Sequence, residues 1–502
     1  MVFALSAVTR YRKGESKEHP YGYYLAAQTH IGGFPLIGTL DTIQNLLLVT
    51  RFGMYHHVGT SLWEISRFCM RQCIEQSLHA RPMRPLGLLE EQHQRRVFWE
   101  CYILDRYSSG VLGRPFAIAD KDITIELPID AADETITQST GANSLASIDI
   151  RTGSHPTELS VFIFHIKLRK VTSRIHSEFY ARRSIPSSSG AATPIPHRSS
   201  SGHIYVKLYQ FLNELDLWRQ DAPVFDSPQS LYERVEWYDF LLEKEKLLLI
   251  RGAIHIAPRR NGQPPDDLLV MCLDSATQII ELYNRMMQIK CITWTRNYFQ
   301  VIFTAGLSII YCVSVGVHNE RSRTGYMHQP VITLALCSNI LRGFRQEMPD
   351  AGRFAIVFEI LKDNLLKDTN IISTLNTEQP DGGTVSHQHV SQGHEAYENN
   401  LQNRLPDSNH LAAALIDMDH SRQDMMGTLT LPQPQTEIRS PLPQIPDDNS
   451  ALSNFGYINM DLHQDEIMDW PTLTDEMMEQ LEAGLGEYAW GSMDTDFHTW
   501  DF

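Results

Sequence analysis

The sequence holds few groups of side chains whose types and spacing could support chemistry. His387, His389 and His394 lie close together and could bind a metal ion, but they sit in a Gln- and Gly-rich stretch without a rigid element to hold them. Cys69 and Cys73 are four residues apart and share one face of a helix, which suits packing as well as ligation. Because no second ligand pair is near them in the sequence, we interpret both thiols as core residues.

Motifs for catalysis and nucleotide binding are missing from the sequence. It contains no phosphate-binding glycine loop, no nucleophile elbow and no His-Glu-x-x-His zinc motif. Asp120 and Asp122 form a carboxylate pair without a companion base, and Gly484 and Gly486 stand among acidic residues that would repel a phosphate. We therefore expect no enzyme, with no catalytic residue and no cofactor or metal ion bound by this chain.

The charge and composition narrow the class of protein. The 502 residues include 43 Lys and Arg against 60 Asp and Glu, and the net charge of −17 argues against a broad basic surface for nucleic acid. Small basic spots such as Arg259–Arg260 are interpreted as solvated loops. With 42% apolar residues the chain can build a sizeable core. Seven cysteines, mostly within apolar runs, indicate free thiols in a reducing compartment.

The elements that must position any site are helices. Between about residues 21 and 376, apolar residues recur every three or four positions, as in 39–58, 59–80 and 89–107. No run of alternating strand residues is long enough for a sheet. We therefore expect an all-α multi-helix domain over 21–376, preceded by an N-terminal extension of residues 1–20.

The most apolar stretch runs from Tyr298 to Val317 and is long enough to span a membrane. It contains the polar residues Gln300 and Thr304, and charged residues flank it on both sides. This mixed polarity favours a buried helix of a large all-α domain, and we expect no membrane contact.

Low-complexity segments interrupt and follow the helical region. Residues 129–156 indicate a linker, and the Ser-, Pro- and Gly-rich residues 184–203 indicate a flexible insertion. Residues 377–450 are rich in Gln, Asn, His, Pro and Ser, a composition from which no core can be built. We expect residues 377–450 to be a disordered linker.

The last 52 residues, 451–502, carry twelve acids and no Lys or Arg, so −12 of the net −17 lies here. Clustered acids keep a segment expanded and leave its apolar side chains available to a partner, and acidic-hydrophobic alternation is typical of disordered activation segments. The expected contact residues are Trp470, Leu473, Met477, Leu481, Trp490, Phe497 and Trp500. The alternative is an amphipathic helix, 475–485, docked on the core.

One stretch resembles a known family. Residues 95–128, RRVFWECYILDRYSSGVLGRPFAIADKDITIELP, are similar to the signature of the fungal-specific transcription factor domain, the regulatory middle region of fungal zinc-cluster regulators. The resemblance covers about residues 20–345. Its structural signature positions here are Arg96, Trp99, Asp105, Arg106, Gly113, Arg114, Pro115 and Pro128.

The residues of this signature indicate structural roles. Gly113 permits a close approach of another group or a positive φ, and Pro115 stops a helix. The planar guanidinium of Arg114 can bind several loop carbonyls or pair with a carboxylate. The resemblance implies an all-α regulatory domain, of a kind proposed to sense small molecules or to restrain activation. It transfers no ligand-contacting residue to this sequence.

The family's DNA-binding module packs six cysteines around two zinc ions in a short N-terminal segment. The densest cysteine group in this sequence is three in 33 residues, from Cys69 to Cys101. We therefore expect zinc only if such a cluster is encoded upstream of Met1. The alternative is a regulator that works without DNA binding of its own.

Together these features predict a fungal transcription regulator located in the nucleus, an activator of a metabolic or secondary-metabolite gene cluster. The expected partners are the transcription machinery or coactivators through the acidic tail, promoter DNA directly or through a partner, and a second copy in a dimer. The first alternative to this function is a regulatory partner or competitor of another regulator, without DNA contact of its own. The second is a ligand-binding or enzymatic protein.

Overall fold

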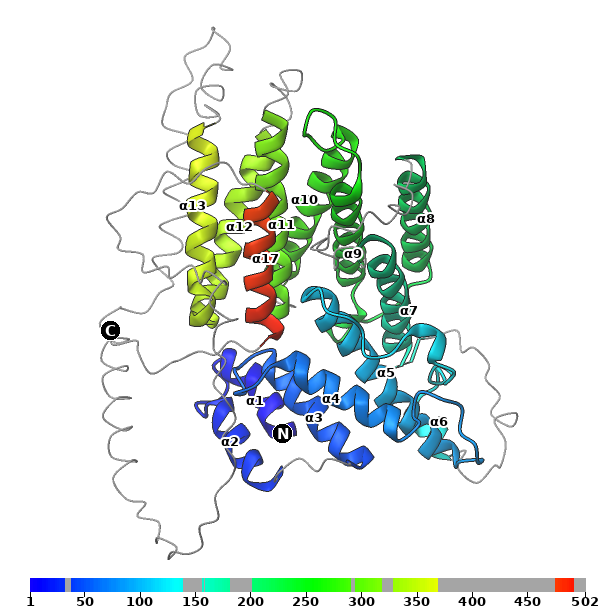
Figure 1. Ribbon diagram of the computed structural model, residues 1–502. Helices are drawn as coiled ribbons and strands as arrows, with labels where there is room; N and C mark the ends of the chain where they lie inside the picture. Colours follow the sequence, from blue (N-terminus) through cyan, green and yellow to red (C-terminus); the bar gives the residue numbers. More distant parts are fainter. Residues whose placement is uncertain are drawn as a thin grey trace, which may run out of the picture. The chain divides into compact units, whose positions relative to one another are not determined.

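The computed structural model describes residues 1–31, 38–138, 156–157, 159–180, 201–289, 294–317, 328–368 and 475–491, which belong to one unit of the chain. Within these ranges the regular elements are helices and no strand is formed (Figure 1), so the predicted all-α fold is confirmed. The predicted linker 377–450, most of the insertion 184–203 and the histidines 387, 389 and 394 lie outside them.

The N-terminal part is built from five helices, which are α1 (Val2–Arg12), α2 (Pro20–Ile31), α3 (Leu40–Gly53), α4 (Leu62–Glu75) and α5 (Leu88–Val111). The expected extension of residues 1–20 contains α1. Ala4 and Val8 of α1 are buried in the same cluster as the apolar residues of α3, α4 and α5. Residues of this extension thus pack into the core of the helical domain.

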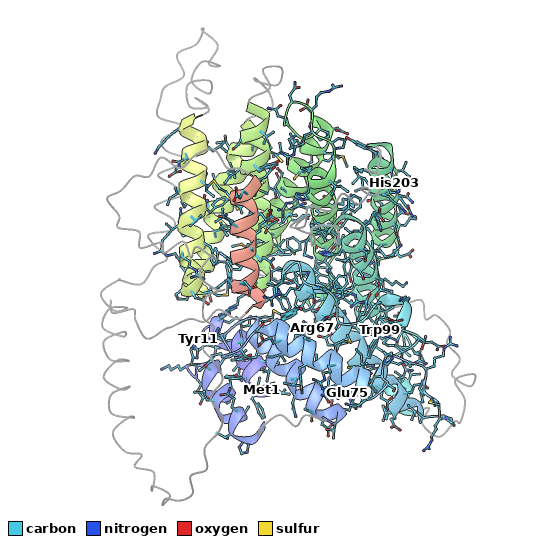
Figure 2. The ribbon with its side chains drawn as sticks, in the orientation of Figure 1. Met1, Tyr11, Arg67, Glu75, Trp99 and His203 are labelled. Carbon is cyan, nitrogen blue, oxygen red and sulfur yellow. The ribbon has the colours of Figure 1, made fainter. Side chains whose placement is uncertain are left out.

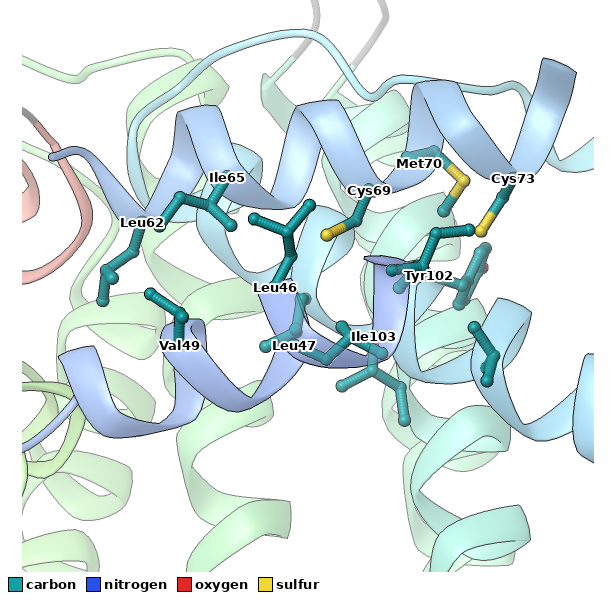
Figure 3. Packing of buried hydrophobic residues seen from close by; sticks show 14 of the residues in the cluster. Leu46, Leu47, Val49, Leu62, Ile65, Cys69, Met70, Cys73, Tyr102 and Ile103 are labelled. Carbon is teal, nitrogen blue, oxygen red and sulfur yellow. The ribbon is translucent and has the colours of Figure 1, made fainter. Parts of the chain in front are cut away.

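The core between α3, α4 and α5 follows from the apolar stripes of these helices (Figure 3). Thr39 and Ser61 begin α3 and α4 as N-caps, because each hydroxyl accepts a hydrogen bond from the backbone N–H three residues on. Cys69 and Cys73 of α4 are fully buried against this core, as expected for core thiols, and so is Tyr102 of α5.

The longer helices that follow are α7 (Ser160–Ile175), α8 (Ser201–Gln220), α9 (Val235–Ile256), α10 (Asp266–Gln288), α11 (Arg296–Val317), α12 (His328–Glu347), α13 (Gly352–Asp368) and α17 (Asp475–Trp490). Short helical segments are η1 (Asp120–Asp122), α6 (Asp133–Gln138), the π-helical turn η4 (His176–Tyr180), η6 (Leu231–Glu233) and η8 (Pro349–Ala351).

The apolar stretch of the sequence forms α11. Among the described residues, α11 is the one helix long and apolar enough to cross a membrane, and 83% of its most apolar window, Arg296–Val315, is buried in the protein. Phe299, Ile302 and Ile309 are each 0% exposed. The prediction of a buried core helix is confirmed.

Candidate functional site

The signature residues join α5 to the irregular segment that follows it. Trp99 is fully buried (Figure 2), and its indole N–H donates to the carbonyl of Glu126 at 2.9 Å. Arg96 pairs with Asp133 at 2.7 Å, and Pro128 is buried. These contacts hold the segment after α5 against the helix, so Trp99 and its neighbours position the site without entering it.

Arg106 is the charged centre of this junction. Its buried guanidinium donates to Asp105, to Asp120 and to the carbonyl of Ile118, each at 2.7 Å. Burial raises the pKa of the Asp105 carboxyl above its usual range. Burial also opposes the ionisation of Asp120, but Arg106 outweighs it, and the pKa of that carboxyl is lowered. Two carboxyl groups and a carbonyl thus satisfy the guanidinium of Arg106, which links α5 to the segment that follows it.

The corner Gly113–Arg114–Pro115 follows directly after α5. Gly113 has a φ of +61°, a conformation that strains an L side chain, and an added Cβ would meet no atom within 4 Å. Of the two expected roles of this glycine, the structure therefore shows the positive φ and not the close approach. The carbonyl of Pro115 accepts from the guanidinium of Arg67 at 3.1 Å. Arg114 lies 4.3 Å from the ring centre of Trp63 and pairs with Glu487 at 2.6 Å. The expected carboxylate partner of Arg114 therefore lies on the C-terminal helix.

The C-terminal helix α17 packs on α11 and α5 (Figure 1, red). Leu485, Tyr488 and Trp490 of α17 are 0%, 3% and 2% exposed. The hydroxyl of Tyr488 donates to Asp350 at 3.1 Å, and the carbonyl of Trp490 accepts from the hydroxyl of Ser61 at 3.0 Å. This end of the chain is held by apolar burial and by two specific hydrogen bonds.

The docked position of α17 differs from the expanded segment that we expected over 451–502. Of the expected contact residues, Met477 and Leu481 are half-buried and Trp490 is buried. The others, Trp470, Leu473, Phe497 and Trp500, lie outside the described residues. The alternative of a docked helix therefore describes residues 475–490. We expected an expanded segment because the composition shows how many acids the tail contains. It does not show which basic side chains of the domain pair with them.

Three acidic residues of α17 form ion pairs with basic residues of the helical domain. They form ion pairs with arginines of three separate segments, Asp475 with Arg259, Glu482 with Arg251, and Glu487 with Arg114. The sequence analysis missed Arg251 and treated Arg259 as a solvated residue. The one signal in the sequence for these pairs was the concentration of acids in the tail, which would pair with basic residues of the domain if the tail docked on it.

A cavity of about 670 Å³ lies between α5, α7, α9, α10, α11 and α17. Its lining includes the corner Gly113–Arg114–Pro115 and apolar side chains such as Leu247, Val301 and Met478. The volume falls within the range of about 300–1,000 Å³ that is typical of small-molecule sites. The signature corner thus has a second role, because it forms part of the wall of this cavity.

A buried charge cluster between α7 and α9 forms another part of the wall. Glu245 accepts from Arg169 and from Lys244, each at 2.8 Å, and from the hydroxyl of Thr172 at 2.9 Å. Burial by itself raises the pKa of Glu245, but the two cations outweigh it and lower the pKa to about 2. Burial lowers the pKa of Lys244 to about 8 against the attraction of Glu245. At neutral pH the cluster therefore carries a net positive charge.

Comparison with known proteins identifies the N-terminal helices. Residues 3–220 match the family model of the fungal specific transcription factor domain. The chain is 22% identical to a positive regulator of purine utilization from Emericella nidulans, over 70% of this chain and 38% of that protein. It is 24% identical to a putative transcriptional regulatory protein of Schizosaccharomyces pombe, over 67% of this chain and 39% of that protein.

Protein STB5 of Saccharomyces cerevisiae is 23% identical, over 73% of this chain and 47% of that protein. The chain thus spans less than half the length of each of these three relatives. No solved structure matches it.

Residues 95–128 lie within the part of the chain that matches the family model of the fungal specific transcription factor domain, so the resemblance found there is confirmed. The matched residues include α1 to α8, and with them Trp99, Arg106 and the Gly113–Arg114–Pro115 corner. The helices α9, α10, α11 and α17, which complete the cavity, lie beyond residue 220. The family domain therefore supplies one side of the site, and the later helices supply the other.

Proposed function

We propose that this chain is a fungal transcription regulator that works in the nucleus as an activator, through a C-terminal acidic helix that the helical domain holds and releases. The family domain supports the regulator class, and the relatives include a positive regulator of purine utilization and an activator of stress genes from Candida albicans. The observation that carries the proposal is that α17 is docked through both its acids and its aromatic residues.

The physical basis is the difference between the docked and the free helix. A segment that recruits the transcription machinery or coactivators offers exposed acids together with apolar side chains. In the docked state Leu485, Tyr488 and Trp490 are buried, and arginines neutralise Glu482 and Glu487. Release exposes both kinds of group at once, so docking suits a two-state control of activation.

The proposal also covers how the chain reaches its genes. A regulator of this family must be brought to promoter DNA, either by a zinc-binding module of its own or by a partner chain, and dimerisation would bring two such modules together. Metabolic or secondary-metabolite genes are the proposed targets. Regulation without any enzymatic activity is part of the same proposal.

A reporter assay tests the proposed function. Residues 451–502 fused to a foreign DNA-binding domain should activate transcription, and the full 502-residue chain in the same fusion should activate less. Arg251→Glu in the full-chain fusion leaves the tail sequence intact and should raise its activity, because it repels Glu482.

The matched control is Arg71→Glu, since Arg71 pairs with Glu75 of the same helix, α4, and these side chains are 66% and 37% exposed. This control should leave reporter activity unchanged. A silent tail, together with a full-chain R251E fusion that stays at the wild-type level, would refute the proposal.

A further inference from the structure

We propose that the cavity beneath α17 binds a small organic carboxylate, which competes with Glu482 for Arg251 and loosens the docked helix. The regulatory half of this inference rests on the function proposed above, whereas the binding half does not.

The first observation is the distribution of charge around the cavity. The helical domain contributes six basic side chains to the lining, which are Arg106, Arg114, Arg169, Lys244, Arg251 and Arg259. The carboxylates among the described lining residues are Asp475, Glu479 and Glu482, and all three belong to α17. The charged side chains of the wall without α17 are therefore all cationic, and the helix itself supplies the anions.

The second observation separates the satisfied cations from those that α17 alone neutralises. Arg106 is held by Asp105 and Asp120, and Glu245 is shared by Arg169 and Lys244. Within the described residues, the ion pairs of the remaining three arginines are made with α17 only.

Arg251 is the most buried of these three arginines, with 20% of its side chain exposed against 33% for Arg114 and 34% for Arg259. A cation that is withdrawn from water needs a counter-ion more than an exposed one does. Arg251 is therefore the arginine at which a competing carboxylate gains most.

The third observation is a pair of polar atoms left without partners in the lining. The Nε–H of Arg169 and the Oε1 of Gln300 are buried and make no hydrogen bond within the described part of the chain. Arg169 is 1% exposed. Such atoms cost free energy unless a partner reaches them, so a ligand with an acceptor for Arg169 and a hydroxyl or amine donor for Gln300 fits here.

The chemistry of the ligand follows from these groups. Leu247, Leu248, Val301 and Met478 give the cavity apolar wall as well as charge, which favours an organic molecule over a bare inorganic ion. The group now bound to Arg251 is a carboxylate, so a ligand carboxylate reproduces the planar pairing that a guanidinium favours.

Binding to the purified 502-residue chain tests the inference by calorimetry. The probes are a panel of organic carboxylates, including phenylacetate and adipate, each paired with its neutral amide, together with inorganic phosphate. At least one carboxylate should bind while its amide does not. Bound carboxylate should also speed hydrogen exchange in residues 475–482.

Variants at the ion pair sharpen the test. Glu482→Gln removes the competing carboxylate and should tighten binding about tenfold, on the order of a charge-assisted hydrogen bond. A gain of affinity cannot result from misfolding. Arg251→Met should abolish binding, Arg251→Lys should retain part of it, and Arg71→Met, on the exposed face of α4, should leave it unchanged.

Several results would overturn the site. They are the absence of carboxylate binding to both the wild type and E482Q, equal binding of acid and amide, or equal binding of phosphate, which would indicate an unspecific anion site. If one of these results is found while the tail still activates the reporter, the proposed ligand site is refuted and the proposed function stands. If a carboxylate binds but the tail does not activate the reporter, the proposed function is refuted and the ligand site stands.

Discussion

Reversal of the charge of Arg251 on α9, which pairs with Glu482 in α17, gives the sharpest test of how α17 is held. In Arg251→Glu, a carboxylate of α9 would face Glu482 in place of the present ion pair. The side chains of Arg251 and Glu482 are 20% and 25% exposed, so solvent screens their interaction less than that of a surface pair. We expect R251E to shift α17 toward the undocked state.

The magnitude lies between two known limits. Exposed ion pairs contribute about 0–1 kcal/mol, and removal of one partner from a buried pair costs about 3–5 kcal/mol. For this partly buried pair we expect the reversal to cost about 2 kcal/mol, which lowers the ratio of docked to undocked helix roughly 30-fold. Glu482→Arg in the same chain restores opposite charges and should recover at least half of the loss.

Hydrogen exchange of the backbone amides of α17 measures this change. Protection of residues 479–490 should fall in R251E and return in the double variant R251E/E482R, whereas protection in α10 should stay constant. Arg71→Glu serves as the matched control, because Arg71 and Glu75 are 66% and 37% exposed. If protection in α17 is unchanged by R251E, or is not recovered in the double variant, the ion pair does not hold the helix.

Two further predictions concern the walls of the cavity. Gly113→Ala places a Cβ at a φ of +61° and should lower the free energy of unfolding by about 1–2 kcal/mol in urea titrations, whereas Gly22→Ala, in open space on α2, should be neutral or stabilising. Burial lowers the pKa of His176 to about 4 from 6.5, so the unfolded chain binds more protons between these values. His176 therefore contributes a loss of stability as the pH falls from 6.5 toward 4, and His176→Gln should flatten this part of the pH profile of the urea midpoint; an unaltered slope would contradict a neutral imidazole.

The helices could be predicted because their signals are local. The apolar stripes of 39–58 and 59–80 depend on residues within one or two turns of each other, and the structure places α3 and α4 there. The positive φ of Gly113 was one of two roles expected for it, because the freedom of a glycine to adopt such a φ depends on that residue alone. Burial of Tyr298–Val317 could be inferred from its mixed polarity alone.

The site could not be predicted, because it depends on pairs far apart in the sequence. Glu482 and Arg251 are separated by 231 positions, and Glu487 and Arg114 by 373. Composition shows that a tail is acidic, but it carries no information about which cation each acid meets. The cavity could not be predicted for the same reason, because its walls come from six helices that approach each other only in the folded chain.

The two halves of α17 depend on charge and on apolar burial to different degrees, and this difference determines how a ligand can act. Glu482 and Asp475 in the first half pair with arginines of the cavity wall, and the Asp475 pair is about a third to a half exposed. The second half also carries an ion pair, that of Glu487 with Arg114, but it buries Leu485 and Trp490 as well, which is an apolar contact that salt does not screen. A carboxylate that binds Arg251 therefore acts first on the half of the helix that depends more on charge. The apolar half then loses its neighbouring contacts and, as an isolated stretch of two turns, is too short to remain a stable helix in water.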